Sequence, residues 1–326
     1  MILFSPKTSL LSTYRLTPLA LLVLSMFAFG CHHFHAGPMP GAPPDAKFFT
    51  VDGVRLHYTD VGEGPAIVLI HGFGSSLEIW HKVVPELSSN HRVVAIDLKG
   101  FGWSSRPEGN YSPTEQGRLV LALMSQLGIE KADVVGHSWG ASVALALALQ
   151  APKRVHRIAL YGAWIYEEQL PPFFLWARAW GVGEFLFSAF YGERMEDQVA
   201  HAYYDPSSIP QERIEAIKEL FSRPGTKAAA LTAVRDQRYD KIQKRYKTLS
   251  HPTLLLWGRE DQVARLHFGE RLRSDIPNAR LKVYPRCGHL PMIEAAASST
   301  RDLVEFLQPQ NLTMLDQSPV VPVREL

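Results

Sequence analysis

The stretch that decides the fold is Ala132–Gln150, which reads ADVVGHSWGASVALALALQ. It contains the pattern G-x-S-x-G around Ser138, which is typical of a tight turn that presents a nucleophilic serine. Gly and Ser are common residues, so these three fixed positions match by chance roughly 0.1 times in a chain of this length. The pattern alone is therefore weak, and the residues around it decide how it is interpreted.

Both flanks of the pattern have the composition that such a turn requires. The apolar run before it predicts a buried strand, and the Ala/Leu run after it has strong helix propensity. Gly136 and Gly140 suit the turn because side chains there would clash with the neighbouring strand and helix. The context therefore predicts that Ser138 lies between a strand and a helix.

The rest of the chain alternates short apolar runs with helical stretches. Continuous apolar runs that end in Gly or a polar residue predict strands buried on both faces, and they include AIVLIHG, RVVAIDLKG, HRIALYG, PTLLLWG and ARLKVYP. Before them, Asp52-Gly53 predicts the turn of a β-hairpin. We expect an α/β fold with a mostly parallel, doubly wound sheet and helices on both faces.

The segment 164–249 interrupts this alternation, because it contains helical stretches and no convincing strand. We interpret it as a helical cap inserted into a sheet domain made of residues 47–163 and 250–308, with a tail at 309–326. The cap is expected to pack its aromatic side chains together, to line an apolar substrate entrance with some of them, or to touch a membrane. These side chains are Phe173, Phe174, Trp176, Trp180, Phe185, Phe187, Phe190 and Tyr191.

The N-terminal segment has the pattern of an export signal over residues 1–30. Two basic residues, Lys7 and Arg15, precede an apolar run over 16–30 that is too short for a comfortable membrane span. The following Cys31 resembles the lipid-bearing first residue of a mature bacterial lipoprotein. We expect an exported protein that its lipid anchors to a membrane on the periplasmic or outer-membrane side; a cleaved signal with a soluble product and a retained anchor are the alternatives.

The next residues, 31–46, are rich in Pro and Gly and predict a flexible linker. Its three histidines, His32, His33 and His35, have no acidic or Cys partner other than Cys31, which we expect to be lipidated, so we expect them to be solvated and predict no metal site. Cys287 is the only other cysteine, which excludes a disulfide framework if Cys31 is lipidated. We expect Cys287 to be a small buried apolar residue.

Composition excludes some partners. The chain has 326 residues, of which 46% are hydrophobic and 20% charged, as in ordinary globular proteins. Two of its 34 basic residues lie in the signal, and the other 32 balance 32 acidic ones. The sequence contains no basic patch of the kind that binds nucleic acid. No pattern points to a protein partner.

A nucleophilic serine needs a base, and the base needs an acid that orients it. Downstream of Ser138, LLLWGREDQV ends a predicted strand and presents Glu260 and Asp261, and VYPRCGHLPMIE ends the last strand and presents His289. The order serine, acid, histidine is the order expected on this kind of sheet. All three positions follow the carboxyl ends of parallel strands, where ligands bind in such sheets.

With the further motifs HGFGSS at 71–76 and DLKGFGWSS at 97–105, residues 48–307 resemble the α/β-hydrolase-fold family, in its capped serine-nucleophile branch of esterases and lipases. The resemblance implies the triad Ser138, Asp261 and His289, with Glu260 as the substitute acid and Asp97 as a less favoured one. It also implies an oxyanion hole formed by the backbone amides of Phe73 and Trp139. His71 and His137 are expected to have structural roles.

The resemblance implies hydrolysis of a carboxylic ester of a hydrophobic small molecule through an acyl-enzyme, without cofactor or metal. Ser138 argues against haloalkane dehalogenases and epoxide hydrolases of this fold, which use an aspartate. Carbon–carbon bond hydrolases of the family typically carry an aromatic residue after the histidine, where this chain has Leu290-Pro291. Other hydrolases, a cofactor-free haloperoxidase or perhydrolase, a peptidase using Glu167-Glu168, and a non-catalytic surface lipoprotein are the alternatives.

Overall fold

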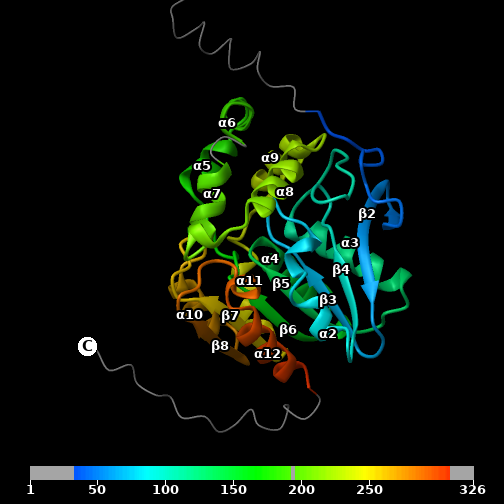
Figure 1. Ribbon diagram of the computed structural model, residues 1–326, viewed down its shortest axis with the longest axis vertical. Helices are drawn as coiled ribbons and strands as arrows, with labels where there is room; N and C mark the ends of the chain where they lie inside the picture. Colours follow the sequence, from blue (N-terminus) through cyan, green and yellow to red (C-terminus); the bar gives the residue numbers. More distant parts are fainter. Residues whose placement is uncertain (1–32, 192–194, 309–326) are drawn as a thin grey trace, which may run out of the picture.

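The computed structural model describes residues 33–191 and 195–308, apart from the side chains of 195–198. Eight strands form one sheet in the order β1-β2-β4-β3-β5-β6-β7-β8, with antiparallel pairing of β1 and β2 and of β2 and β4 and parallel pairing elsewhere (Figure 1). The strands are β1 (Lys47–Val51), β2 (Val54–Val61), β3 (Ala66–Ile70), β4 (Arg92–Ile96), β5 (Ala132–His137), β6 (Val155–Tyr161), β7 (Thr253–Gly258) and β8 (Ala279–Tyr284). The predicted α/β fold with a mostly parallel sheet is confirmed.

The hairpin between β1 and β2 forms where the sequence predicts it. Asp52 has φ 49° and Gly53 has φ 76°, and these two positive values are the ones that a two-residue turn between twisted antiparallel strands requires.

Helices cover both faces of the sheet because the central strands are apolar on both faces. On β3, Val68 and Ile70 pack in one buried cluster, and Ile67 and Leu69 pack in another. The first cluster includes residues of α3 (Pro113–Gln126), α4 (Trp139–Gln150) and α10 (Leu266–Asp275). The second includes residues of α2 (Val84–Leu87), α11 (Pro291–Glu294) and α12 (Ala296–Leu307).

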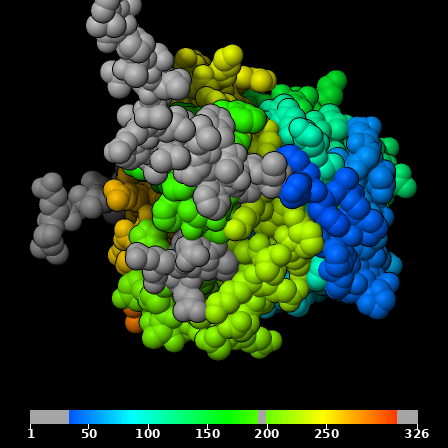
Figure 2. All heavy atoms as spheres, turned by 90° about the horizontal axis from the view of Figure 1, so that it is seen from above, coloured from blue at the N-terminus to red at the C-terminus, as the bar shows by residue number. Residues whose placement is uncertain are grey.

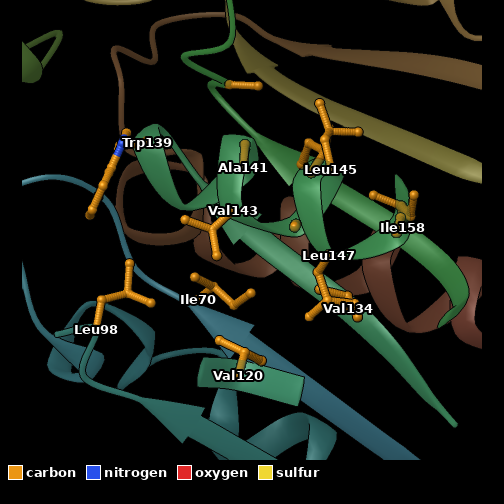
Figure 3. Close-up of a cluster of buried hydrophobic side chains, with 14 of the residues drawn as sticks. Ile70, Leu98, Val120, Val134, Trp139, Ala141, Val143, Leu145, Leu147 and Ile158 are labelled. Atoms are coloured by element: carbon orange, nitrogen blue, oxygen red, sulfur yellow. The ribbon is translucent and has the colours of Figure 1, made fainter. Parts of the chain in front are cut away.

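Figure 3 shows part of the first cluster around α4. Val143 and Leu147 of this helix point toward Ile70 of β3 and Val134 of β5, and Val120 of α3 closes the other side. All five side chains are at most 1% exposed. This packing holds α4, and hence the turn that precedes it, firmly on the sheet.

Five helices follow β6 and precede β7: α5 (Pro172–Ala177), α6 (Val182–Phe190), α7 (Met195–Ala202), α8 (Gln211–Ser222) and α9 (Thr226–Asp236). They gather at one end of the molecule (Figure 1). Helices α5, α6 and α9 pack on one another around a small apolar core of their own, which contains Phe187, Leu231 and Val234. The expected helical cap is therefore present.

The described part of the expected flexible linker, residues 33–46, differs from the prediction. His35 and Arg106 exchange two backbone hydrogen bonds of 2.9 and 2.7 Å, and Met39 is only 3% exposed beside the Arg106 guanidinium. Backbone pairing and burial of Met39 thus outweigh the Pro- and Gly-rich composition. The signal, Cys31 and the tail after residue 308 lie outside the described residues, and within the described ranges no helix is long and apolar enough to cross a membrane.

Candidate active site

Ser138 forms the turn between β5 and α4. Its backbone has φ 52° and ψ −122°, a conformation that costs a non-glycine residue about 1–3 kcal/mol. The surrounding backbone holds it there: Ser138 N donates to Tyr161 O at 2.9 Å, and Ser138 O accepts from Trp164 N at 3.0 Å. The strain is imposed by β5, β6 and α4 together, as expected for a turn that presents a reactive side chain.

Three glycines allow the chain to pass this turn. A Cβ on Gly136 would lie 2.6 Å from Gly140 O, and a Cβ on Gly140 would lie 2.3 Å from His71 O. A Cβ on Gly72 would lie 2.9 Å from Cβ of Ser138, so the loop after β3 runs directly beside the serine. The steric reason predicted for the glycines on either side of Ser138 is confirmed.

His289 and Asp261 form a buried pair after β8 and β7. Nδ1 of His289 lies 2.8 Å from Oδ2 of Asp261, and the two residues are 5% and 3% exposed. The other carboxylate oxygen, Oδ1, accepts from Val263 N at 2.8 Å and Ala264 N at 2.7 Å. Because a carboxylate faces Nδ1, that nitrogen donates and Nε2 is left as an acceptor.

His289 is brought next to the serine turn by contacts with other elements. Its backbone N donates to Ala202 O of α7 at 2.7 Å, and its carbonyl oxygen lies 3.1 Å from Nε2 of His137. The rings of His137 and His289 are 4.7 Å apart. Since His137 directly precedes Ser138, the structure brings all three predicted triad residues to one edge of the sheet.

The two substitute acids have other partners. Oε2 of Glu260 accepts from Cys287 N at 3.0 Å. Asp97 accepts from Nδ1 of His57 at 2.7 Å and from Leu77 N at 2.7 Å. Asp261 is thus the acid that contacts His289, and Asp97 fastens the loop that follows β3.

The pKa of Asp97 is lowered overall. Burial alone would raise it, but the hydrogen bonds from His57 and from Trp103 N more than compensate. Asp97 is 1% exposed, so its carboxylate depends on these donors rather than on water. It therefore belongs to a buried network that stabilises the loop.

His71 and His137 are buried and neutral. Nδ1 of His71 donates to Gly72 O at 2.7 Å and Nε2 accepts from Leu98 N at 3.0 Å, which fixes the backbone of the loop after β3. Burial lowers the pKa of His71, and burial and the neighbouring His289 lower that of His137. These contacts agree with the structural roles expected for both.

The two predicted oxyanion donors flank the serine. Trp139 is the first residue of α4, where backbone N–H groups have no carbonyl partner within the helix and point along its positive end. Phe73 follows Gly72, the residue in contact with Ser138, and its ring lies 6.1 Å from that of Trp139. Both residues are thus neighbours of the serine turn, Trp139 in the sequence and Phe73 through the adjacent Gly72.

Aromatic side chains surround this position. Phe73 is 5.4 Å from Phe101 and 5.5 Å from Phe174 of the cap, and Trp164 is 6.1 Å from Phe174. The predicted cap aromatics therefore divide: Phe174 borders the site, others such as Phe173 and Phe187 pack together, and a third group is exposed.

Gly162 is a site residue that sequence reasoning missed. It directly follows β6 and has φ 46°, and a Cβ there would lie 3.0 Å from Nδ1 of His289 and 3.1 Å from Oδ2 of Asp261. Its only signal in the sequence is a glycine at the end of the apolar run HRIALYG. The absence of a side chain at Gly162 thus leaves room for His289 and Asp261.

The described residues contain no group of three or more His, Cys, Asp or Glu placed to hold a metal ion. Cys287, two residues before His289, is 0% exposed and free, and burial raises its pKa. The prediction that Cys287 is a buried apolar residue is confirmed.

The fold and site can now be compared with known proteins. Residues 65–202 and 213–296 match the family described as the alpha/beta hydrolase fold. A 2-hydroxy-6-oxo-2,4-heptadienoate hydrolase of Pseudomonas putida is 31% identical over 279 residues, which cover 78% of this chain and 93% of that one. This chain therefore belongs to the alpha/beta hydrolase family and is a hydrolase of that fold.

Two solved structures illustrate the range of its relatives. A meta-cleavage product hydrolase from Pseudomonas fluorescens IP01 is 33% identical with a TM-score of 0.69, over 80% of this chain and 96% of that one. Est816, described as an N-acyl homoserine lactone degrading enzyme, is 27% identical with a TM-score of 0.69, over 80% of this chain and 100% of that one. The matches thus include enzymes named for different substrates.

Proposed function

We propose that the chain is a serine hydrolase that cleaves carboxylic esters of hydrophobic small molecules. The observation that carries the proposal is the buried hydrogen bond of 2.8 Å between His289 and Asp261, next to the strained turn at Ser138. A histidine oriented by a carboxylate at this place can accept the proton of the serine hydroxyl.

In the first half of the reaction, Nε2 of His289 takes the proton of Ser138 as Oγ attacks the substrate carbonyl carbon. The backbone N–H groups of Phe73 and Trp139 donate to the resulting oxyanion, and such donors are worth about 3–4 kcal/mol each in comparable sites. The intermediate collapses to an acyl-enzyme when the leaving alkoxide takes the proton from His289.

In the second half, water loses a proton to His289 and attacks the acyl carbon. The oxyanion again binds the same two amides, and the second collapse returns the proton to Ser138 and releases the carboxylic acid. Asp261 keeps its negative charge throughout and stabilises the imidazolium in both halves.

The aromatic side chains support an apolar acyl or aryl group on the substrate. Around the serine turn, the ring of Phe73 lies 5.4 to 6.1 Å from those of Phe101, Trp139 and Phe174. Such walls bind apolar groups by excluding water from them.

A second candidate is cleavage of a carbon–carbon bond in an oxo-dienoate. Two of the proteins reported above are named for such substrates or for meta-cleavage products, and the same serine attack on a ketone can expel a carbon group. Leu290 stands where those hydrolases typically have an aromatic residue, which favours the ester reaction. One observation favours the second candidate: the Arg213 guanidinium contacts Tyr203, and its Nε is buried without a hydrogen-bond partner. Tyr203 follows Ala202, whose carbonyl accepts from His289 N, so we propose that Arg213 binds a substrate carboxylate near the site.

Initial rates on matched substrates separate the two candidates. We expect the full-length protein to hydrolyse p-nitrophenyl butyrate and an acyl lactone faster than a 2-hydroxy-6-oxo-dienoate. Arg213→Gln should leave the rate on the neutral ester unchanged, whereas it should lower any activity on the dienoate. Faster turnover of the dienoate by the unmodified protein would contradict the ester proposal.

Labelling of the serine tests whether the chain is an enzyme at all. A fluorophosphonate should label the full-length protein and should fail to label Ser138→Ala. A protein that is neither labelled nor active on esters, lactones or the dienoate would instead be a non-catalytic member of the family.

We also propose that the chain is held at a membrane by a lipid on Cys31, as a lipoprotein on the outer side of the cytoplasmic membrane or at the outer membrane. The support is the sequence of residues 1–31. Cys31→Ser should move the protein from the membrane fraction to the soluble fraction, and unchanged fractionation would contradict lipidation.

A further inference from the structure

Exposed apolar side chains are concentrated on one part of the cap. Of the seven large hydrophobic residues that are exposed in the described part of the chain, five lie between residues 175 and 190. We call them the exposed cap patch: Leu175, Trp176, Trp180, Val182 and Phe190. Trp176 is 63% exposed and Trp180 is 81% exposed, and tryptophans this exposed are unusual in a protein that meets only water.

The exposed cap patch is distinct from the packed side of the same helices. Phe187 of α6 is 0% exposed and lies 5.6 Å from Phe173 and 5.0 Å from Tyr191. Helices α5 and α6 therefore have apolar residues on two sides, and only one side is covered by the cap's own core. The other side requires a different apolar contact.

The described chain begins close to this end of the molecule. A Cβ on Gly225, between α8 and α9, would lie 2.8 Å from His35 N, so residue 35 rests against the cap. Figure 2 looks onto this end and shows the first described residues, in blue, beside the cap helices, in green and yellow-green. The apolar run at 16–30 and Cys31 precede this point in the sequence, within about 20 residues of it.

We propose that the exposed cap patch lies in the surface of the phospholipid bilayer to which the N-terminal segment leads. Tryptophan prefers the boundary between lipid headgroups and hydrocarbon, because its ring is apolar and its N–H is polar. Docking through α5 and α6 turns the cap toward the membrane. Hydrophobic substrates dissolved in the bilayer then reach the enzyme from the side on which Phe174 borders the site.

Charges near the exposed cap patch indicate which lipid is needed. Trp180 borders a surface groove of about 730 Å³ that is also lined by Arg178, Arg235 and Asp236. Arg178 is paired with Glu167, and Arg235 is paired with Glu184 at 2.8 Å. Arg238 also lines the groove, near Asp236. Because a carboxylate thus accompanies each of the three arginines, the apolar contacts should provide the affinity, and phosphatidylcholine without anionic lipid should be sufficient.

The test uses tryptophan fluorescence of the full-length protein reconstituted into phosphatidylcholine vesicles, with or without bromine on the lipid chains. Bromine quenches tryptophans that enter the bilayer, and residues 1–32 contain no tryptophan, so the anchor adds no signal. We expect quenching of the wild type and loss of most of it in Trp176→Tyr/Trp180→Tyr, in which docking is retained. Trp103→Tyr is the matched control, because Trp103 lies under the Arg223 guanidinium in the core domain, and it should leave the quenching unchanged.

Circular dichroism and the rate on a soluble ester, unchanged in both variants, show that the fold is intact. The proposal is overturned if brominated lipid does not quench the wild type, which is the result expected if a second copy of the chain or the N-terminal segment covers the patch. It is also overturned if quenching survives in the double variant.

Discussion

The sheet edge buries polar side chains, whereas the cap exposes apolar ones. At the edge, Ser138, Asp261 and His289 are at most 7% exposed, and backbone hydrogen bonds from neighbouring elements hold each of them. On the cap, Trp176 and Trp180 are largely exposed. The backbone of neighbouring elements therefore holds the proposed catalytic residues in place, whereas the cap presents apolar side chains to its surroundings.

The ion pairs of the cap reinforce this difference. The side chains of Lys218 and Glu215 on α8 are 41% and 58% exposed, and surface pairs of this kind contribute about 0–1 kcal/mol. Asp97, in contrast, is a buried acceptor for His57 and two backbone N–H groups. We expect the cap to open locally at a lower free energy than the sheet edge does.

The largest effect should come from the nucleophile itself. Ser138→Ala is expected to lower kcat by about 10⁶-fold, as for the serine of comparable triads. Because alanine keeps Cβ in the same strained conformation, the melting temperature should stay close to that of the wild type. Ester hydrolysis and thermal unfolding measure the two quantities.

A comparison of glycine with alanine at position 138 measures the backbone strain of the turn. Ser138→Gly should be more stable than Ser138→Ala by about 1 kcal/mol, since glycine accepts this backbone conformation without a steric penalty. Equal stability of the two variants would show that the turn is not strained.

The second-largest effect is expected at Asp261, and it distinguishes this carboxylate from the neighbouring Glu260. Asp261→Asn should lower kcat by about 10⁴-fold, because the amide cannot stabilise the His289 imidazolium. Glu260→Gln should cost at most about tenfold, in line with weakening of one hydrogen bond to Cys287 N. A reversed order in steady-state kinetics would make Glu260 the triad acid.

Gly162→Ala tests how tightly the backbone of β6 confines the pair. The new Cβ would displace His289 or Asp261, and a displacement of this kind can lower the rate by about 10²-fold. Gly128→Ala is the control, because Gly128 has φ 68° but a Cβ there meets nothing within 4 Å. Equal loss of activity in both variants would attribute the effect to backbone strain alone.

The buried network of Asp97 should be visible in the pH dependence of stability. Its folded-state pKa lies below the unfolded value of about 3.9, so its ionisation stabilises the fold above that value. This contribution is lost as the pH falls through the folded pKa. In urea titrations, the unfolding free energy of the wild type should therefore decrease more steeply below about pH 4 than that of Asp97→Asn. Parallel curves would contradict a stabilising role for the ionised carboxylate.

The smallest effect is expected on the cap surface. Trp180→Ala should change the unfolding free energy in water by no more than about 0.5 kcal/mol, because its side chain is mostly solvated. The matched core variant is Trp257→Ala on β7, which is 0% exposed and should cost about 3–5 kcal/mol. A large loss in the cap variant would mean that the patch stabilises the fold rather than serving as a contact surface.

The sequence was sufficient for the sheet, the cap and the sheet edge at which Ser138, Asp261 and His289 lie, because each depends on local pattern. Buried strands, the glycines around Ser138 and the order of serine, acid and histidine are all visible along the chain. Gly162 was missed, since only the packing of β6 against two distant loops shows why a side chain is excluded there. Residues 33–46 were misjudged for a related reason: their composition does not reveal the pairing of His35 with Arg106.

The substrate is the part that pattern predicts least. Leu290 stands at a position where carbon–carbon bond hydrolases typically have an aromatic residue. A relative that is 31% identical is nevertheless named an oxo-dienoate hydrolase. Arg213 lies on α8, far from the motifs in sequence, and only the fold places it beside Tyr203. The neighbourhood of Arg213 and Tyr203 is a contact within the cap that local sequence patterns do not specify.

Cys287 has a consequence for the compartment in which the enzyme can work. Peroxides and disulfide exchange attack the thiolate, and this thiol is fully buried with a raised pKa. Oxidants outside the cytoplasm would therefore not react with the Cys287 thiol, although Cys287 lies two residues before His289. The active-site loop can tolerate an oxidising environment without losing its cysteine.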